Sequence, residues 1–232
     1  MQPFRFKQFE VRHDHCAMKV NTDGVLLGAW ADVDGAKRAL DVGTGSGVIA
    51  LMLAQRGVHH IEALEIDQEA AEQALENFTQ SGWSAALQVH PMALQQFLPE
   101  AAYDLIVSNP PYFDNAYKTP LANRNLARHN DTLPLNDLMA FTAEWLTQKG
   151  KLDIILPVEM ENSAKQHASS HGLYLNRCCR VKGVAGGDTK RLLLEFGREE
   201  QKLFLSDITI EISPLVYTSE YKELLKDFYL AF

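Results

Sequence analysis

Short apolar runs alternate with helix-like stretches through most of the chain after residue 37. Strands are predicted where apolar residues are continuous or alternate with polar ones, over 38–43, 61–66, 85–90, 103–109 and 151–157. Helices are predicted where apolar residues recur every three or four positions, over 47–57, 68–82, 93–99, 135–150 and 159–172. This alternation is typical of a parallel sheet with helices on both faces. The expected fold class is therefore α/β, a doubly wound sheet whose ligands bind at the carboxyl ends of the strands.

The two ends of the chain depart from this alternation. Residues 4–14 alternate between apolar and polar and predict a hairpin, while residues 22–32 begin with threonine and aspartate, which predicts a capped helix. The last quarter of the chain is β-rich and ends in an aromatic helix over 219–232. Because no linker or repeat divides the sequence, we expect one domain over 1–232 with an N-terminal extension over 1–35.

The composition is that of an ordinary globular protein. Hydrophobic residues make up 46% and charged residues 22% of 232 residues, and no apolar run reaches the length of a membrane span. The polar N-terminal residues MQPFRFKQFEVRHD are unlike a signal peptide, so we expect a cytoplasmic protein. The 3 cysteines form neither a disulfide framework nor a CxxC pair, and the 8 histidines form no metal-binding pattern. We therefore expect no metal.

The charge pattern leaves a nucleic-acid partner open. A net charge of −8 disfavours a general nucleic-acid binder, but the segment 177–191 carries five basic residues against one acid. The segment 112–134 carries a second basic group and is long for an α/β connection, which indicates a loop that closes on substrate. In this loop Arg124 and Arg128 are four positions apart and would share one face of a helix. Each basic group either contacts phosphates or is an ordinary solvated surface, and composition does not decide between the two.

A glycine-rich sequence, Asp41-Val-Gly43-Thr44-Gly45-Ser-Gly47, joins a predicted strand to a predicted helix. Glycine tolerates positive φ and lets a ligand approach the backbone, where the free N–H groups of the helix face it. The third glycine comes one residue earlier than in the GxGxxG pattern of dinucleotide sites, and Asp41 would repel a pyrophosphate. The same carboxylate suits a cationic ligand, such as the amino group or the sulfonium of S-adenosylmethionine. The alternative is a tight turn without a ligand.

An acid follows the next predicted strand. Glu65 stands about 20 residues after the glycine sequence, where an acid at a strand end accepts hydrogen bonds from both ribose hydroxyls. Ile66 offers an apolar surface for adenine. Asp67 directly precedes a predicted helix, so we interpret it as the cap of that helix.

The fourth predicted strand ends in Asn109-Pro110-Pro111-Tyr112. An exocyclic amino group is a poor nucleophile because its lone pair is delocalised into the ring. The side-chain oxygen of Asn109 and the carbonyl of Pro110 would accept its two hydrogens and favour a more sp3-like nitrogen. Pro111 stiffens the turn so that these acceptors stay aimed, and Tyr112 can stack on the ring. The alternative is a rigid exit from the strand.

The order of glycine loop, ribose acid and Asn-Pro-Pro-Tyr resembles the class I methyltransferases that modify planar nitrogens. The flanks narrow the resemblance to the bacterial tRNA adenine-N6 methyltransferases that modify position 37 of valine tRNA; these flanks are Phe9, Asp14, 16–20, 22–30, 217–221 and 228–230. The resemblance spans nearly the whole chain. It implies a Rossmann-like, S-adenosylmethionine-dependent methyltransferase fold with antiparallel C-terminal strands, and methyl transfer to adenine N6 in the anticodon loop of tRNA.

The resemblance also assigns residues to the cofactor. In related enzymes the segment before the glycine loop lies over the methionine end of the cofactor, which implies roles for Lys19, Thr22 and Asp23; a helix cap at the last two, with a solvated Lys19, explains them as well. Related enzymes usually carry an Asp for the cofactor adenine where this chain has Ala93. Met92 or a backbone group would replace it.

On the substrate side we expect contacts from Pro111, Tyr112, Arg124, Arg128, Arg180 and Lys182. Two other functions remain open at this point. One is methylation of a glutamine amide in a protein, because Asn-Pro-Pro-Tyr also serves that substrate. The other is a nucleotide-binding module without activity. The sequence leaves the oligomeric state open, with a monomer the simplest expectation.

Overall fold

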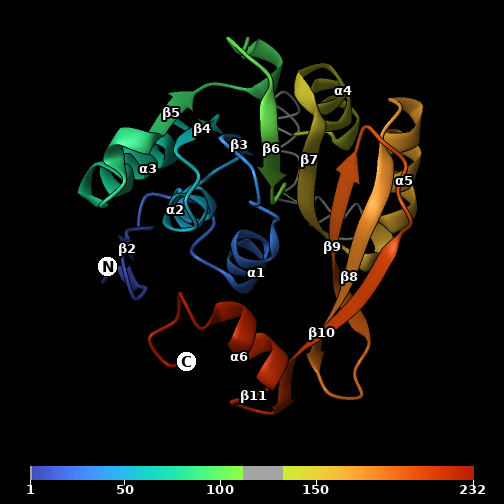
Figure 1. The fold of residues 1–232 in the computed structure, drawn as a ribbon. Coiled ribbons are helices and arrows are strands. Elements are labelled where there is room, and N and C mark those ends of the chain that lie inside the picture. Colours follow the sequence, from blue (N-terminus) through green and yellow to red (C-terminus); the bar gives the residue numbers. More distant parts are fainter. Residues whose placement is uncertain (1, 112–132) are drawn as a thin grey trace, which may run out of the picture.

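The fold is built around one mixed sheet, which the computed structural model describes within residues 2–111 and 133–232 (Figure 1). The strand order is β11-β10-β8-β9-β7-β6-β3-β4-β5. The strands are β3 (Arg38–Val42), β4 (His60–Glu65), β5 (Leu87–Pro91), β6 (Tyr103–Ser108), β7 (Leu146–Pro157), β8 (Tyr174–Val184), β9 (Thr189–Gly197), β10 (Phe204–Ser213) and β11 (Val216–Tyr217). The expected alternation of strands and helices is thus confirmed.

The first strands of the sheet are parallel. β3 pairs with β4 and with β6, β4 pairs with β5, and β6 pairs with β7, all in parallel. β9 is antiparallel to both β7 and β8, and β11 is antiparallel to β10. The expected antiparallel C-terminal strands are therefore present, while β10 in addition pairs in parallel with β8. In the sheet β9 lies between β7 and β8. After β9 the chain therefore passes β8, and β10 pairs with the outer side of β8.

Helices cover both faces of the sheet (Figure 1). One core contains buried residues of α1, α2, α3 and α6, and the other contains those of α4 and α5. The helices are α1 (Thr22–Trp30), α2 (Val48–Gln55), α3 (Gln68–Gln80), α4 (Leu135–Trp145), α5 (Glu161–Ser170) and α6 (Ser219–Leu225), with 3-10 turns η1 (Ser84–Ala86), η2 (Leu94–Gln96) and η5 (Val158–Met160). None of the helices in the described ranges is long and apolar enough to cross a membrane.

Several predicted helix boundaries change, among them that of the helix expected over 219–232, which ends at Leu225. The helix expected over 93–99 is reduced to the single turn η2. The helix expected over 135–150 ends at Trp145, because the guanidinium of Arg198 binds the carbonyl oxygens of Ala143 and Leu146 and so satisfies the helix end. The cap of α1 is Asn21, whose side chain accepts a hydrogen bond from the Gly24 amide at 2.9 Å, and not the threonine and aspartate that follow.

The N-terminal extension packs against the C-terminus rather than standing apart. The predicted hairpin is present as β1 (Phe4–Arg5) and β2 (Glu10–Val11). Phe6 stacks on Tyr229, with ring centroids 6.0 Å apart, and the ammonium of Lys7 donates to the carbonyl oxygen of Phe232 at 2.6 Å. The two termini therefore lie on the same side of the molecule (Figure 1).

Candidate active site

The sequence motifs meet at one edge of the sheet. Val42, the last residue of β3, pairs with Leu64 in β4 and with Ser108 in β6. The residues that follow, Gly43 and Asn109, therefore leave the sheet side by side, next to the end of β4. The hydroxyl of Ser108 donates to the Val42 carbonyl at 2.8 Å, which fixes the ends of the two central strands together.

The three glycines of the loop have different tasks. All have positive φ, +74° at Gly43, +55° at Gly45 and +82° at Gly47. A Cβ atom at Gly43 or Gly45 would meet nothing within 4 Å, so these two residues line open space that a ligand can occupy. A Cβ at Gly47 would lie 2.4 Å from Cε1 of Phe78, so this glycine is required for packing against α3.

The glycine loop is bonded to the end of β4. The amides of Gly43 and Thr44 both donate to the Leu64 carbonyl at 2.9 Å, and the amide of Gly45 donates to Oε2 of Glu65 at 2.8 Å. These three N–H groups are therefore already used within the protein. The N–H groups expected to face a ligand are those at the start of α2, and among them the Ala50 amide donates to Oδ2 of Asp41 at 3.2 Å.

Asp41 lies buried beneath the loop, with a fractional exposure of 0%. Its Oδ2 accepts hydrogen bonds from the Thr44 hydroxyl at 2.6 Å and from the Ala50 amide at 3.2 Å. Its Oδ1 is buried, and no described residue donates to it. Burial raises the pKa of Asp41 to about 7, because the charged form loses its hydration. A carboxylate with one oxygen that no described residue binds can pair with a cationic group.

The carboxylate of Glu65 connects the loop to the following turn. Besides Gly45, it accepts a hydrogen bond from the Asp67 amide at 3.0 Å through Oε1, and lone pairs remain on both oxygens for ribose hydroxyls. Ile66 is 44% exposed, in keeping with an apolar surface for adenine. Asp67 caps α3 by accepting from the Ala70 amide at 3.0 Å, as predicted.

The residues expected at the two ends of the cofactor lie around the start of α1 and just after β5. Lys19 and Thr22 are exposed. Asp23 accepts a hydrogen bond from Nε of Arg191 at 2.7 Å, which connects α1 to β9. At the other end, Met92 and Ala93 are half-buried after β5, and the Met92 amide donates to the His90 carbonyl at 2.9 Å. Nothing at position 93 supplies the carboxylate that related enzymes carry.

The substrate side is described in part. Asn109 is half-buried, Pro110 is buried and Pro111 is exposed at the carboxyl end of β6. The predictions for Tyr112, Arg124 and Arg128 lie outside the described residues, as does 112–132 of the expected substrate loop.

The basic segment 177–191 forms β8, its turn and the start of β9. Arg177 does not serve a ligand, since its guanidinium pairs with Glu195 at 2.6 Å and lies over the Trp30 ring at 4.1 Å. Arg180 is exposed and Lys182 is half-buried further along β8. Because β8 runs in the direction of β7, these two residues lie toward the same edge as Asn109.

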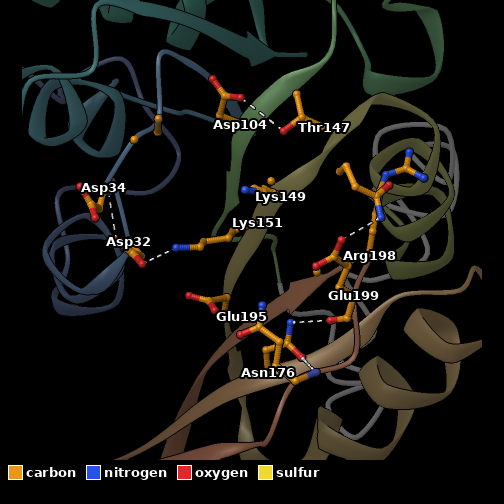
Figure 2. A pocket seen from close by; sticks show the side chains of 16 residues that line it. Asp32, Asp34, Asp104, Thr147, Lys149, Lys151, Asn176, Glu195, Arg198 and Glu199 are labelled. Carbon is orange, nitrogen blue, oxygen red and sulfur yellow. Dashed lines mark hydrogen bonds and ion pairs between the residues drawn. The ribbon is translucent and has the colours of Figure 1, made fainter.

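A cavity of about 470 Å³ lies at the opposite edge of the sheet (Figure 2). Its polar groups bind one another: Lys151 pairs with Asp32, and the side-chain Nδ2 of Asn176 donates to the Glu199 carbonyl at 3.1 Å. Asp104 accepts hydrogen bonds from the backbone at the start of β3, so its carboxylate is used within the fold. Across the described ranges, no group of three His, Cys, Asp or Glu side chains is placed to hold a metal ion.

Sequence reasoning missed two residues near the site. Gln73 and Asn77 are one turn apart on α3, and both are buried. Both bind the N-terminal extension, and Asn77 also binds the glycine loop. The available signal was a pair of polar residues on the otherwise apolar face of an amphipathic helix.

Comparison with known proteins agrees with this geometry. The sequence model of the methyltransferase small domain family matches residues 16–165. A tRNA1(Val) (adenine(37)-N6)-methyltransferase from Christiangramia forsetii is 46% identical over 99% of this chain and 98% of its own length. A protein of the same name from Trichodesmium erythraeum is 45% identical over 99% and 98%. The crystal structure of a predicted O-methyltransferase from Agrobacterium tumefaciens shares the fold, with a TM-score of 0.65 and 20% identity over 89% of this chain and 96% of that one.

Proposed function

This chain belongs to the family of the tRNA1(Val) (adenine(37)-N6)-methyltransferases, and we propose that it transfers a methyl group from S-adenosylmethionine to the N6 amine of adenine 37 in tRNA1(Val). One observation carries the proposal. The glycine loop, with open space beside Gly43 and Gly45, and the Asn109-Pro110 turn leave adjacent strands at the same edge. A methyl donor held by the loop would therefore lie next to groups that can hold an amine. A tRNA substrate implies that the enzyme works in the cytoplasm.

The residues of the loop fit the donor. S-adenosylmethionine supplies a methyl group already activated on a positively charged sulfur. Asp41 would face a cationic part of it through Oδ1, since no described residue binds this buried oxygen. Glu65 would accept the ribose hydroxyls and Ile66 would contact the adenine. Thr44 acts through Asp41, because its hydroxyl donates to that carboxylate.

Asn109 and Pro110 would hold the substrate amine. The side-chain oxygen of Asn109 and the carbonyl of Pro110 accept its two hydrogens, so that the nitrogen lone pair turns away from the ring and toward the methyl group. With the donor bound, N6 would form its new bond to the methyl carbon as that carbon leaves the sulfur, and the surplus proton of N6 would pass to solvent. Because the leaving group is already activated, the protein contributes mainly orientation. Tyr112 would stack on the target base, and Pro111 would keep the turn rigid.

The basic side chains at this edge would hold the RNA. Arg180 and Lys182 lie along β8 toward the edge that carries Asn109, where the phosphates of an anticodon loop would pass. Arg124 and Arg128 in the segment 112–134 would add further phosphate contacts. These contacts matter because the net charge of −8 gives no general attraction to RNA.

The function is tested by a methylation assay with purified protein and labelled S-adenosylmethionine. The two substrates are unmodified tRNA1(Val) and a protein extract, and the nucleosides are analysed by mass spectrometry. We expect N6-methyladenosine at position 37, and no label when that adenine is replaced by guanine. Label found only in protein would refute the proposal and support the glutamine methyltransferase alternative.

The role of Asn109 is tested by Asn109→Ala, with the exposed Asn162→Ala on α5 as the matched control. We expect kcat to fall by about a hundredfold or more, the usual effect of removing one group that orients the reacting atoms. Cofactor affinity, measured by calorimetry, should stay within roughly twofold because the donor is held by other residues. Equal losses in turnover and cofactor affinity would contradict the assigned role.

A further inference from the structure

The buried face of α3 contains two amide side chains among small apolar residues. Gln73 and Asn77 have fractional exposures of 4% and 2%, and their neighbours on this face include Ala70, Ala74 and Phe78. A buried amide stabilises a fold only when its polar atoms are bonded. The partners of these two side chains therefore indicate what they do.

Asn77 joins three separate parts of the chain. Its Oδ1 accepts a hydrogen bond from the Arg12 amide at 2.9 Å, and its Nδ2 donates to the Arg12 carbonyl at 2.8 Å. The same Nδ2 donates to the Ser46 carbonyl at 2.8 Å. One side chain on α3 therefore fixes both the backbone after β2 and the glycine loop, between Gly45 and Gly47.

Gln73 continues this connection one helical turn earlier. Its Oε1 accepts a hydrogen bond from the His15 amide at 2.8 Å. The next residue, Cys16, is buried, and its pKa is raised to about 11 by burial and by the nearby carboxylates of Glu65 and Asp67. Residues 12–16 therefore run from the glycine loop toward the ribose acid.

We propose that Asn77 is a positioning residue of the cofactor site, which it serves by holding residue 12 and Ser46 at a fixed separation. It does not touch the cofactor. The end of β4 holds the first part of the loop through the amides of Gly43, Thr44 and Gly45, and Asn77 holds the next residue, Ser46, which lies between two glycines of positive φ. Without the bonds of Asn77, Ser46 and residue 12 would lose their shared anchor on α3, and cofactor binding would have to fix their separation. The inference rests on the proposed function, because it assumes that the loop binds S-adenosylmethionine.

The test is Asn77→Asp, which keeps the shape and the acceptor for Arg12 but turns an oxygen toward the carbonyls of Arg12 and Ser46. The control is Ala74→Gly, which weakens the same helix at a buried position without any bond to the loop. Cofactor Kd is measured by calorimetry, stability by urea unfolding, and kcat with both substrates saturating. We expect Kd to rise about tenfold in Asn77→Asp, while kcat stays within roughly twofold because Asn77 does not touch the reacting atoms.

The control separates positioning from simple stability. Ala74→Gly should unfold at lower urea concentration yet keep the Kd of the wild type. The inference is overturned if folded Asn77→Asp binds the cofactor as the wild type does, or if both variants lose affinity in proportion to stability. Should Asn77→Asp fail to fold, Asn77→Ser is measured by the same criteria. Absence of cofactor binding by the wild-type protein would instead refute the proposed function.

Discussion

The buried carboxyl group of Asp41 leads to a sharp prediction about pH. Asp41→Asn preserves the shape of the side chain and the acceptor for Thr44 and Ala50, but it removes the ionisable group. In the folded protein burial raises the pKa of Asp41 to about 7, from an ordinary value of 3.8. Between these two values the folded chain keeps a proton that the unfolded chain has released. The stability contributed by this group is therefore complete below about pH 4 and lost as the pH rises through 7.

The size of the effect follows from the same two pKa values. Each pH unit well inside this interval costs about 1.4 kcal/mol, and the cost falls off near pH 7, so the wild-type protein should lose about 2 kcal/mol from this group between roughly pH 5 and pH 7. Asp41→Asn has no such dependence. Its new amide nitrogen replaces the buried Oδ1, which no described residue binds, and an unpaired buried donor costs about 1–3 kcal/mol at every pH. In acid the protonated wild-type carboxyl carries an unpaired O–H of its own at Oδ1, so the two proteins should be similar in stability there, and the wild type should become the less stable one as the pH rises through neutrality.

Urea unfolding of the cofactor-free proteins in steps from about pH 5 to pH 8 measures this difference, because ionisable groups shared by both proteins cancel. Asp188→Asn, in the exposed turn between β8 and β9, is the control and should follow the wild type in parallel. If the difference between Asp41→Asn and the wild type stays constant within about 1 kcal/mol, the raised pKa is refuted. Calorimetry in buffers of different ionisation enthalpy extends the test. Near pH 6 the wild-type protein should release a proton on cofactor binding, because a cationic ligand favours the ionised form of Asp41, whereas the variant should not.

Two further predictions concern the glycine loop and the RNA surface. Gly45→Ala should lose only about 1–2 kcal/mol of stability from its positive φ, but more than tenfold in cofactor affinity, because its methyl group enters open space beside the loop. Gly47→Ala should lose about 2–5 kcal/mol of stability, since its methyl group also collides with the buried phenylalanine ring of α3. Urea unfolding measures the stability of the two variants, and calorimetry measures their cofactor affinity. A larger loss of stability in Gly45→Ala than in Gly47→Ala would contradict the separate roles of these glycines. The double variant Arg180→Ala/Lys182→Ala should raise the KM for tRNA. It should also reduce the slope of log KM against log salt concentration by the amount that about two phosphate contacts contribute, whereas Lys149→Ala at the opposite edge should change neither quantity. An unchanged salt dependence would exclude β8 from the RNA interface.

Much of the fold could be predicted because most of its strands and helices depend on the hydrophobic pattern of their own residues. The strands at 38–43, 61–66 and 103–109 and the helix at 68–82 follow from hydrophobic periodicity, and their observed ends differ by one or two residues. Hydrophobic periodicity was less informative where a residue distant in sequence determines the end of a helix. The helix predicted over 135–150 ends early because Arg198, about 50 residues further along, binds its last carbonyl groups.

The candidate site divides in the same way. Asp41, Gly43 and Glu65 could be found because each motif has its own spacing relative to a predicted strand. Asn77 could not be given a role, because its partners, Arg12 and Ser46, are brought to α3 only by the folded chain. The split of tasks among the glycines was equally hidden, since it depends on which of them faces a ring of α3.

The sequence by itself determined the class of fold, the order of the motifs along it and the chemistry that each motif can perform. It did so because hydrophobic periodicity, glycine content and side-chain chemistry are local properties. The tertiary structure alone decided which motifs touch and in what electrostatic environment. The contact between Gly45 and Glu65, the raised pKa of Asp41 and the connection through Asn77 depend on groups brought together by the sheet and its helices. Hydrogen bonding and desolvation act over a few ångströms in space, whatever the separation in sequence.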